Sequence, residues 1–246
     1  MTTFDDLLAR ACALGGLPGA QAGHGAPAAL SSSAPPGDQA AAGIPRAILG
    51  IVGEPGAGKT TLAEELVSAL AAFGPPGWVA HVPMDGFHLA DVELDRLGNR
   101  DRKGAPDTFD ALGYAALLRR LRDDTDDVVY APGFERVIEQ PIAGAIPVRR
   151  AARLIVTEGN YLLVDDDRWS HVRPLLDEVW YADLDQVTRL ERLIARHHRF
   201  GKDPAAAQAW ATGPDAQNAA VIAATRDRAH LIIPSALIHT LGTPPD

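Results

Sequence analysis

The sequence predicts an α/β fold in which a parallel β-sheet carries helices on both faces. From about Pro45 onward, short apolar runs alternate with amphipathic segments, which is the pattern of successive strand and helix units. The first apolar run, 48–52, passes through a glycine-rich turn into a segment with Leu62, Leu66 and Leu70 at helical spacing. These two observations together predict the fold class.

The glycine-rich turn carries a phosphate-binding motif. Residues 53–60 match G-x-x-x-x-G-K-[ST] without a mismatch, as in P-loop NTPases. Its glycines let successive backbone N–H groups point at phosphate oxygens, and the following helix adds the positive end of its dipole. Lys59 can reach the β- and γ-phosphates, and the Thr60 hydroxyl can ligate Mg²⁺. The residues expected to bind ATP in this loop are Gly53, Glu54, Pro55, Gly56, Ala57, Gly58, Lys59, Thr60 and Thr61.

Composition excludes several classes of protein. The net charge of −9 and the pI of about 5.3 argue against general nucleic-acid binding, which needs a basic face. A single cysteine, Cys12, excludes an internal disulfide and a cysteine-based zinc site. The dinucleotide motif G-x-G-x-x-G fails, because Thr61 stands where its third glycine would be.

The sequence also indicates where the protein works. It contains no run of about 18 apolar residues, so we expect no membrane span and no membrane partner. The first residues are acidic where a secretory signal would be basic, so a cytoplasmic location is the default expectation. The sequence leaves the oligomeric state open between a monomer and a homodimer.

The chain divides into four predicted parts. Residues 1–14 contain a short helix with one apolar face, and residues 15–44, rich in Ala, Gly, Pro and Ser, are a predicted flexible linker. The main domain is expected over 45–238, followed by a tail over 239–246. The length of 246 residues is enough for one large α/β domain with its own core.

Two acidic residues follow predicted strands. Asp85 comes directly after the apolar stretch 78–84, and Glu158 ends the strand that begins near Arg153. Ligands of open α/β sheets bind beyond the carboxyl ends of the strands, where the phosphate loop also lies. Asp85 can therefore accept a proton from an attacking hydroxyl or help to hold Mg²⁺, and Glu158 is expected to steady Mg²⁺ together with Thr60. The alternatives are an Asp that starts a turn and a Glu at the surface.

The segment between these strands is expected to supply the acceptor pocket. Residues 89–106 are charged and loop-like, 110–122 read as a helix, and 128–130 read as a short strand that continues into a loop. The candidate acceptor-binding residues are His88, Lys103, Asp107, Glu135 and Arg136. An N-cap role for Asp107 and a solvated charge pair for Glu135 and Arg136 are the competing interpretations.

Arginines recur on one face of a predicted helix over about 187–199. Arg189, Arg192 and Arg196 share that face, and Arg199 lies beyond them. In a phosphate-binding fold, such a helix can close as a lid and stabilise charge on the transferred group, with Lys59, Arg192 and Arg196 as catalytic candidates and Arg199 as an ATP ligand. The alternative is a solvated helix face.

The remaining elements complete the predicted domain. A helix is expected over 169–176, a strand over 178–183, a loose connection over 203–216, a helix over 218–228 and a last strand over 230–233.

Several stretches together resemble one family. They are the phosphate loop and residues 84–87 (Met-Asp-Gly-Phe), 103–110 (Lys-Gly-Ala-Pro-Asp-Thr-Phe-Asp), 130–134 (Tyr-Ala-Pro-Gly-Phe) and 157–159 (Thr-Glu-Gly), followed by the arginine helix. In this order they resemble the uridine kinase, phosphoribulokinase and pantothenate kinase family of P-loop kinases, over about residues 47–233. The pattern is most similar to a nucleoside/nucleotide kinase-like bacterial branch that includes proteins named as fructose-transport-associated kinases.

The resemblance implies a kinase activity but does not identify the acceptor molecule. It implies an ATP- and Mg²⁺-dependent kinase acting on a hydroxyl of a small metabolite, with Asp85 as the catalytic base and the loop and lid arginines on ATP. Uridine kinases carry a Tyr-Asp pair where 133–136 read Gly-Phe-Glu-Arg, and the pantothenate kinase pattern is only partly present. A nucleoside, a sugar and a pantothenate- or glycerate-like alcohol therefore all stay open. A regulatory ATPase or nucleotide switch of a transport system is the alternative function.

Overall fold

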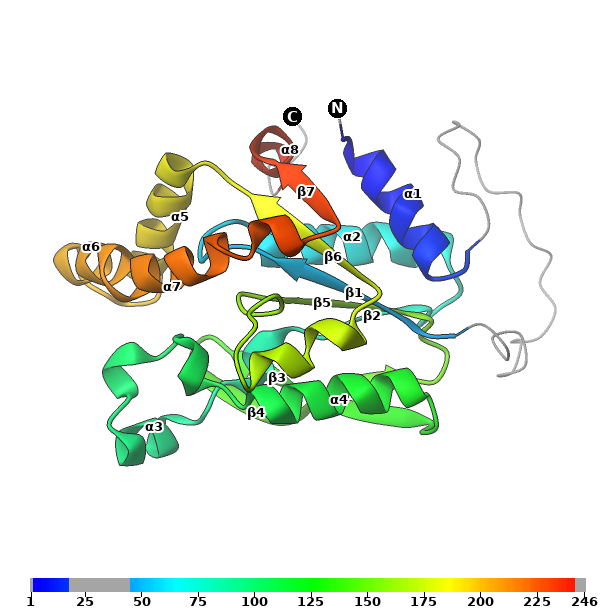
Figure 1. Cartoon of the computed structure of the whole chain (residues 1–246), viewed down its shortest axis with the longest axis horizontal. Helices are drawn as coiled ribbons and strands as arrows, with labels where there is room; N and C mark the ends of the chain where they lie inside the picture. Colours follow the sequence, from blue (N-terminus) through cyan, green and yellow to red (C-terminus); the bar gives the residue numbers. More distant parts are fainter. Residues whose placement is uncertain (1, 18–44, 242–246) are drawn as a thin grey trace.

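A five-stranded parallel sheet forms the centre of the protein (Figure 1). The computed structural model describes residues 2–17 and 45–241. In spatial order the strands are β2 (Val79–His81), β5 (Leu154–Gly159), β1 (Ala47–Val52), β6 (Glu178–Asp183) and β7 (Leu231–Pro234). Every neighbouring pair in this sheet is parallel, so the predicted fold class is confirmed.

The strand order fixes where a ligand can bind. The chain leaves β1 toward β2 and β5 on one side and later toward β6 and β7 on the other, so the order reverses beside β1. Such a reversal opens a crevice beyond the carboxyl ends of the strands. The register sets Val52 opposite both Gly159 and Tyr181, so the segments that follow β1, β5 and β6 all begin at this crevice.

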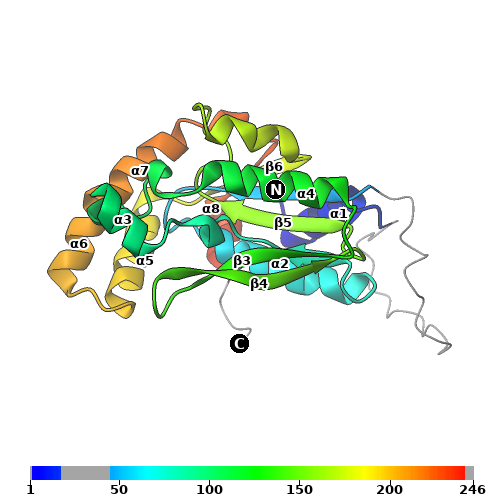
Figure 2. The same ribbon diagram turned by 90° about the horizontal axis from the view of Figure 1, so that it is seen from below.

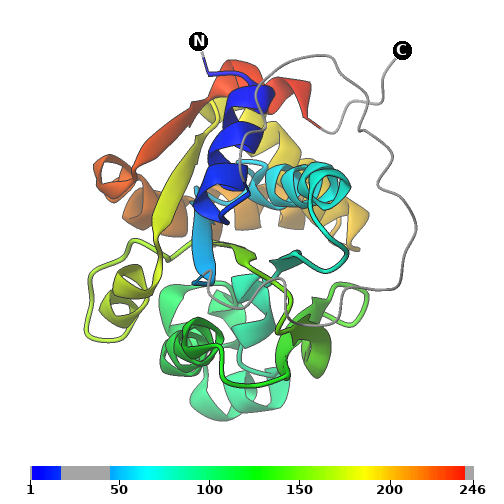
Figure 3. The same ribbon diagram turned by 90° about the vertical axis from the view of Figure 1, so that its right-hand side faces the viewer.

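Helices cover both faces of the sheet. On one face lie α1 (Phe4–Leu14), α2 (Lys59–Phe73) and the short α8 (Ser235–Thr240), packed on Leu49 and Ile51. The opposite face, with Ile48 and Val52, packs on α4 (Ala111–Asp123) and on residues 161–176. Figure 3 shows α1 beside α2 on the first face. Strand residues alternate between two apolar layers, as expected for a sheet that is buried on both sides.

The N-terminal helix begins at a capping box. The Thr3 hydroxyl accepts a hydrogen bond from the Asp6 N–H, and the Asp6 carboxylate accepts one from the Thr3 N–H. Leu7, Leu8 and Ala11 are buried, so the apolar face predicted from the sequence packs on the domain. Residues 18–44 of the predicted linker and 242–246 of the predicted tail lie outside the described residues.

A separate antiparallel hairpin replaces the predicted loop after residue 130. It consists of β3 (Val128–Glu135) and β4 (Gln140–Arg149), and Figure 2 shows it apart from the main sheet. The prediction of a loop was wrong because Pro132, Pro141 and Pro147 read as strand breakers. A two-stranded ribbon has two free edges, so it tolerates residues without an N–H, and the register shifts between Ala131 and Gly133, around Pro132.

Helices replace two segments that were predicted to be irregular. The charged stretch after residue 89 contains α3 (Asp91–Leu97), which ends at Gly98 with φ +68°. The predicted loose connection contains α6 (Pro204–Thr212) and the start of α7 (Pro214–Ala223), which follow α5 (Gln186–Arg199). Both α6 and α7 begin with proline at the first helical position, a start signal that the loop interpretation overlooked.

Three further boundaries differ from the sequence prediction. β2 is only three residues long, and residues 84–87 form a 3₁₀ turn instead of continuing the strand. Residues 169–176 form two short 3₁₀ turns, because Pro174 supplies no N–H for a continuous helix. α8, Ser235–Thr240, is a further helix after the last predicted strand, where the sequence predicted no helix. Within residues 2–17 and 45–241, no helix has the length and apolar character needed to cross a membrane.

The hairpin is seated against the turn that follows β2, and a glycine makes this possible. A Cβ atom added at Gly86 would lie 2.3 Å from the carbonyl oxygen of Pro132 in β3. We therefore expect Gly86→Ala to destabilise the fold by about 1–3 kcal/mol through overpacking, which corresponds to a melting temperature lower by roughly 2–12 °C. Thermal unfolding of wild type and variant measures this. An unchanged melting temperature would contradict the close seating of the hairpin.

Candidate active site

The phosphate loop connects β1 to α2 and has the curled backbone that its sequence predicts. Gly56 and Gly58 have φ of +85° and +84°, the left-handed region that favours glycine. A Cβ atom at Gly56 would lie 2.7 Å from the carbonyl oxygen of Arg189, so a side chain has no room there. α2 begins at Lys59, and its free N-terminal N–H groups face the loop. The loop can therefore cradle an anion.

Lys59 is a buried cation at the start of α2, with 8% of its surface exposed. Its Nζ donates a hydrogen bond to the carbonyl oxygen of Glu54, 3.0 Å away. Burial lowers the pKa of Lys59, while the nearby Glu158 carboxylate opposes this shift. A buried ammonium group that has turned back onto its own loop fits a site for phosphate oxygens, which would bind it more strongly than one neutral carbonyl does.

Two carboxylates and a hydroxyl lie beside Lys59. The Thr60 hydroxyl donates to Glu158 Oε1 at 3.1 Å. Burial and the charge of Asp85 raise the pKa of Glu158 to about 7. Glu158 and Asp85 come together because β5 packs tightly on the 3₁₀ turn that carries Asp85: a Cβ atom at Gly159 would lie 2.6 Å from Met84.

This donor set fits Mg²⁺ only together with other oxygen ligands. Carboxylate and hydroxyl oxygens are the ligands that Mg²⁺ prefers. A divalent cation would also offset the repulsion between two neighbouring carboxylates. No group of three or more His, Cys, Asp or Glu side chains suited to a metal occurs among residues 2–17 and 45–241. Phosphate oxygens and water would have to complete the coordination, as is usual for Mg²⁺ in kinase sites.

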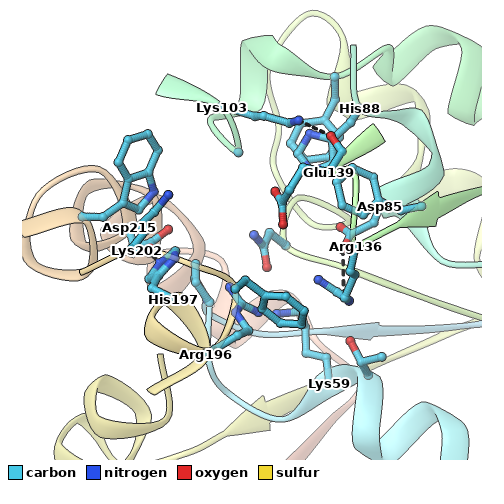
Figure 4. Close-up of a pocket in the computed structure, with 18 of the residues that line it drawn as sticks. Lys59, Asp85, His88, Lys103, Arg136, Glu139, Arg196, His197, Lys202 and Asp215 are labelled. Atoms are coloured by element: carbon cyan, nitrogen blue, oxygen red, sulfur yellow. Dashed lines mark hydrogen bonds and ion pairs between the residues drawn. The ribbon is translucent and has the colours of Figure 1, made fainter. Parts of the chain in front are cut away.

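Asp85 faces a cavity of about 300 Å³ that opens beyond the phosphate loop (Figure 4). Arg136 reaches Asp85 from the hairpin, with 3.4 Å between its Nη2 and Asp85 Oδ2. His88 lies one turn further along, where its ring stacks on Phe109 at 3.9 Å between centroids. Burial lowers the pKa of His88 to about 4, so its ring is neutral at physiological pH.

The outer wall of the cavity is formed by the hairpin and the loop after α3. Two cations lie near the Phe134 ring, with Lys103 Nζ 5.6 Å and Arg136 Cζ 6.0 Å from its centroid. Lys103 also forms an ion pair with Asp91 at 2.6 Å and donates a hydrogen bond to the Glu139 carbonyl. This wall combines an apolar ring with several hydrogen-bond donors, which suits a small polar molecule.

The arginines of α5 have different roles from one another. Arg196 lines the cavity, and its positive charge acts on Lys59. Arg189 is buried behind the phosphate loop: its Nη1 donates to the carbonyl oxygen of Pro55 at 3.0 Å, and its Nε lies 2.8 Å from Glu54 Oε2. Arg189 therefore braces the loop and does not face the cavity, although the sequence pattern grouped it with the lid residues.

The predicted site residues are brought together in part. Lys59, Thr60, Asp85, His88, Lys103, Arg136, Glu158 and Arg196 all line the cavity. Four others do not. Asp107 pairs with Arg102, and the Glu135 carboxylate accepts a hydrogen bond from the Val137 N–H at 3.0 Å. Arg199 lies over the Phe200 ring, and Arg192 Nη1 would lie 3.5 Å from a Cβ atom added at Gly58.

Several lining residues were not among the predicted site residues. They are Arg100, Gly104, Phe109, Phe134, Glu139, Asn160, His197, Phe200, Lys202, Trp210 and Asp215. Two of them pair with each other: His197 Nε2 lies 2.6 Å from Asp215 Oδ2, and both residues line the cavity (Figure 4). The start signal of α7 at Pro214 could have pointed to Asp215, because a carboxylate in the first turn of a helix is a common anchor.

Comparison with known proteins places the chain among kinases. No family model matches the sequence. The chain is 36% identical over 156 residues to a Schizosaccharomyces pombe protein named "Putative uridine kinase", an alignment that covers 62% of this chain and 66% of that protein. It is 33% identical over 145 residues to the "ATP-dependent kinase-like protein notR'" of Aspergillus versicolor, covering 55% of this chain and 84% of that protein.

A solved structure extends the similarity over nearly the whole chain. The crystal structure of a "putative fructose transport system kinase" from Silicibacter sp. TM1040 is 32% identical, has a TM-score of 0.75, and covers 95% of this chain and 100% of that one. The motif order, the sheet topology and these relatives agree. The chain therefore belongs to the P-loop kinases, in the group that includes proteins named as uridine kinases and as ATP-dependent kinases.

Proposed function

We propose that the protein is an ATP- and Mg²⁺-dependent kinase that phosphorylates a hydroxyl group of a small metabolite. The observation that carries the proposal is that one cavity is lined by the buried Lys59 ammonium group and by the Asp85 carboxylate. The first suits the transferred phosphoryl group, and the second suits the hydroxyl that attacks it. A cavity of about 300 Å³ has room for a small metabolite and not for a macromolecule.

The nucleotide half of the site holds the triphosphate. Backbone N–H groups of the loop 53–61, other than that of Pro55, which has none, bind phosphate oxygens, and the Lys59 Nζ exchanges the Glu54 carbonyl for the β- and γ-phosphates. Arg196 adds positive charge from the lid side, where charge on the transferred group increases in the transition state. Thr60, Glu158 and Asp85 would hold Mg²⁺, which when bound neutralises phosphate charge and aligns the phosphates.

The acceptor half of the site positions a hydroxyl group. Asp85 accepts the hydroxyl proton as the new O–P bond forms, and the bond from the γ-phosphorus to the β–γ bridging oxygen breaks with its electron pair, releasing ADP. Arg136 orients the Asp85 carboxylate through their 3.4 Å contact. His88, Lys103 and Phe134 form the wall around the acceptor. The neutral His88 ring can donate or accept a hydrogen bond without adding charge.

The test of this proposal is whether ATP consumption depends on an added acceptor. The purified full chain is mixed with ATP, Mg²⁺ and a library of hydroxyl-bearing metabolites, and ADP release and product mass are measured together. We expect ADP release to rise only with acceptors that gain a phosphoryl group. ATP hydrolysis that ignores every acceptor but responds to a protein partner would overturn the proposal and favour a regulatory ATPase of a transport system.

Removal of the proposed base should affect turnover far more than nucleotide binding. Asp85→Asn keeps the size of the side chain but cannot accept the hydroxyl proton, so we expect kcat to fall by about 10²–10⁴-fold. The KM for ATP should change by less than about threefold, because Lys59 and the loop remain. Steady-state kinetics measure both constants. Normal turnover by the variant would show that another group takes the proton.

Variants of two arginines of α5 distinguish the effect of bracing the phosphate loop from the effect of losing a surface charge. Arg189→Met breaks a buried ion pair with Glu54, so we expect a loss of about 3–5 kcal/mol of stability and a KM for ATP raised by about tenfold or more. Arg199→Met removes the same charge from an exposed position on the same helix and should leave both quantities nearly unchanged. Equal effects of the two variants would contradict the bracing role.

A further inference from the structure

All the lysines of this chain line the active-site cavity, and one of them has no role in the proposed reaction so far. Only three of the 23 basic residues in the sequence are lysines, namely Lys59, Lys103 and Lys202. All three line the same cavity. A lysine on a solvated surface needs no explanation, but a chain that otherwise uses arginine and gathers every lysine at one site indicates that a compact ammonium group is needed there.

Two of the three lysines have partners that account for them. Lys59 belongs to the phosphate loop and lies near the Glu158 carboxylate. Lys103 pairs with Asp91 at 2.6 Å and donates to the Glu139 carbonyl, so it fastens the loop after α3 to α3 and to the hairpin. Neither position requires a further anion from the acceptor.

Lys202 has no such partner among the residues that the structure describes. It follows α5 and lies across the cavity from Lys59, on the side formed by α6 and α7 (Figure 4). Within the described ranges 2–17 and 45–241, no carboxylate lies within 4.0 Å of its Nζ. Asp215 is on the same side, but its carboxylate is already bound to His197 at 2.6 Å. The positive charge of Lys202 therefore faces the cavity unneutralised by an ion pair.

The Trp210 indole ring holds this cation in place. Lys202 Nζ lies 4.5 Å from the ring centroid, a distance at which an ammonium group is attracted to the face of the ring. An aromatic face orients a cation without neutralising its charge, so the ammonium group keeps its capacity to bind an anion. Lys202 lies away from the phosphate loop (Figure 4). An anion that it binds is therefore expected to be part of the acceptor and not of the triphosphate.

We infer that the acceptor is an anion as well as an alcohol, and that Lys202 binds its carboxylate or phosphate group. This inference rests on the proposed kinase function and narrows its acceptor class. The acceptor then spans the cavity, with its hydroxyl at Asp85 and its acidic group at Lys202. A neutral sugar or nucleoside would leave Lys202 without a counter-ion in the closed site, where an unpaired charge is costly.

The experiment compares acceptors in neutral and anionic pairs with the full chain, ATP and Mg²⁺. The pairs are glycerol and glycerate, ribose and ribose 5-phosphate, and uridine and uridine 5′-monophosphate. We expect the anionic member of the productive pair to have a kcat/KM at least about tenfold higher. Lys202→Met should lower kcat/KM for that acceptor by about 10- to 100-fold through its KM, with the KM for ATP changed by less than about twofold.

Further variants control for folding and for charge. Lys202→Arg keeps the positive charge and should recover part of the lost affinity for the acceptor. Arg120→Met removes one positive charge from the exposed side of α4, outside the cavity, and should leave acceptor kinetics unchanged. Melting temperatures of all three variants show whether a loss of activity reflects unfolding.

The outcomes distinguish failure of this inference from failure of the proposed function. Phosphorylation of neutral acceptors alone, with no effect of Lys202→Met, would overturn the inference and leave the kinase function intact. A raised KM for ATP in Lys202→Met, with the KM for the acceptor unchanged, would assign Lys202 to the nucleotide and would also overturn it. ATP hydrolysis that is independent of every acceptor would overturn the proposed function and the inference together.

Discussion

The site depends on two opposite charges that are buried together at the carboxyl end of the sheet. Lys59 and Glu158 are 8% and 3% exposed, and removing such groups from water is costly unless they find partners. The parallel register forces them together, because Val52 at the end of β1 lies opposite Gly159 at the end of β5. Burial shifts their pKa values in opposite directions, and each group opposes the shift of the other. A polyphosphate with a divalent cation would offer both groups stronger partners.

The rest of the site is assembled around this pair by segments far apart in the sequence. The hairpin brings Arg136 to Asp85, and close packing at Gly86 and Gly159 holds the turn of Asp85 against both β3 and β5. From the other side, the Asn218 amide donates to the Gly104 carbonyl at 3.3 Å, and the Tyr161 hydroxyl donates to the same oxygen. α7 and the segment after β5 are thereby connected, through Gly104, to the loop that carries Lys103.

The sequence was sufficient wherever a local pattern determines the geometry. The phosphate loop, the Asp85 carboxylate after β2 and the Glu158 carboxylate at the end of β5 could be predicted, because glycine conformation and the parallel strand pattern dictate them. Three kinds of feature could not. The hairpin was hidden by its prolines, Lys202 and Asp215 depend on how α5 and α7 pack, and Arg189 shares a helical spacing with Arg196 although one is buried and the other lines the cavity. The spacing of residues along a helix predicts which of them share a face, but it does not predict what that face contacts.

The contrast between Arg189 and Arg196 indicates how the lid is built. They lie two turns apart on one helix, yet the first is fixed to Glu54 and Pro55 and the second has no carboxylate partner within 4.0 Å in the described part of the chain. The start of α5 is therefore anchored to the phosphate loop, whereas Arg196 near its end and Lys202 just after it line the cavity. A rigid anchor at one end lets a small rotation of α5 move Arg196 and Lys202 over the cavity together. A rotation that carried both cations would bring charge to the phosphates and to the proposed acceptor in the same step, and it would exclude water before transfer.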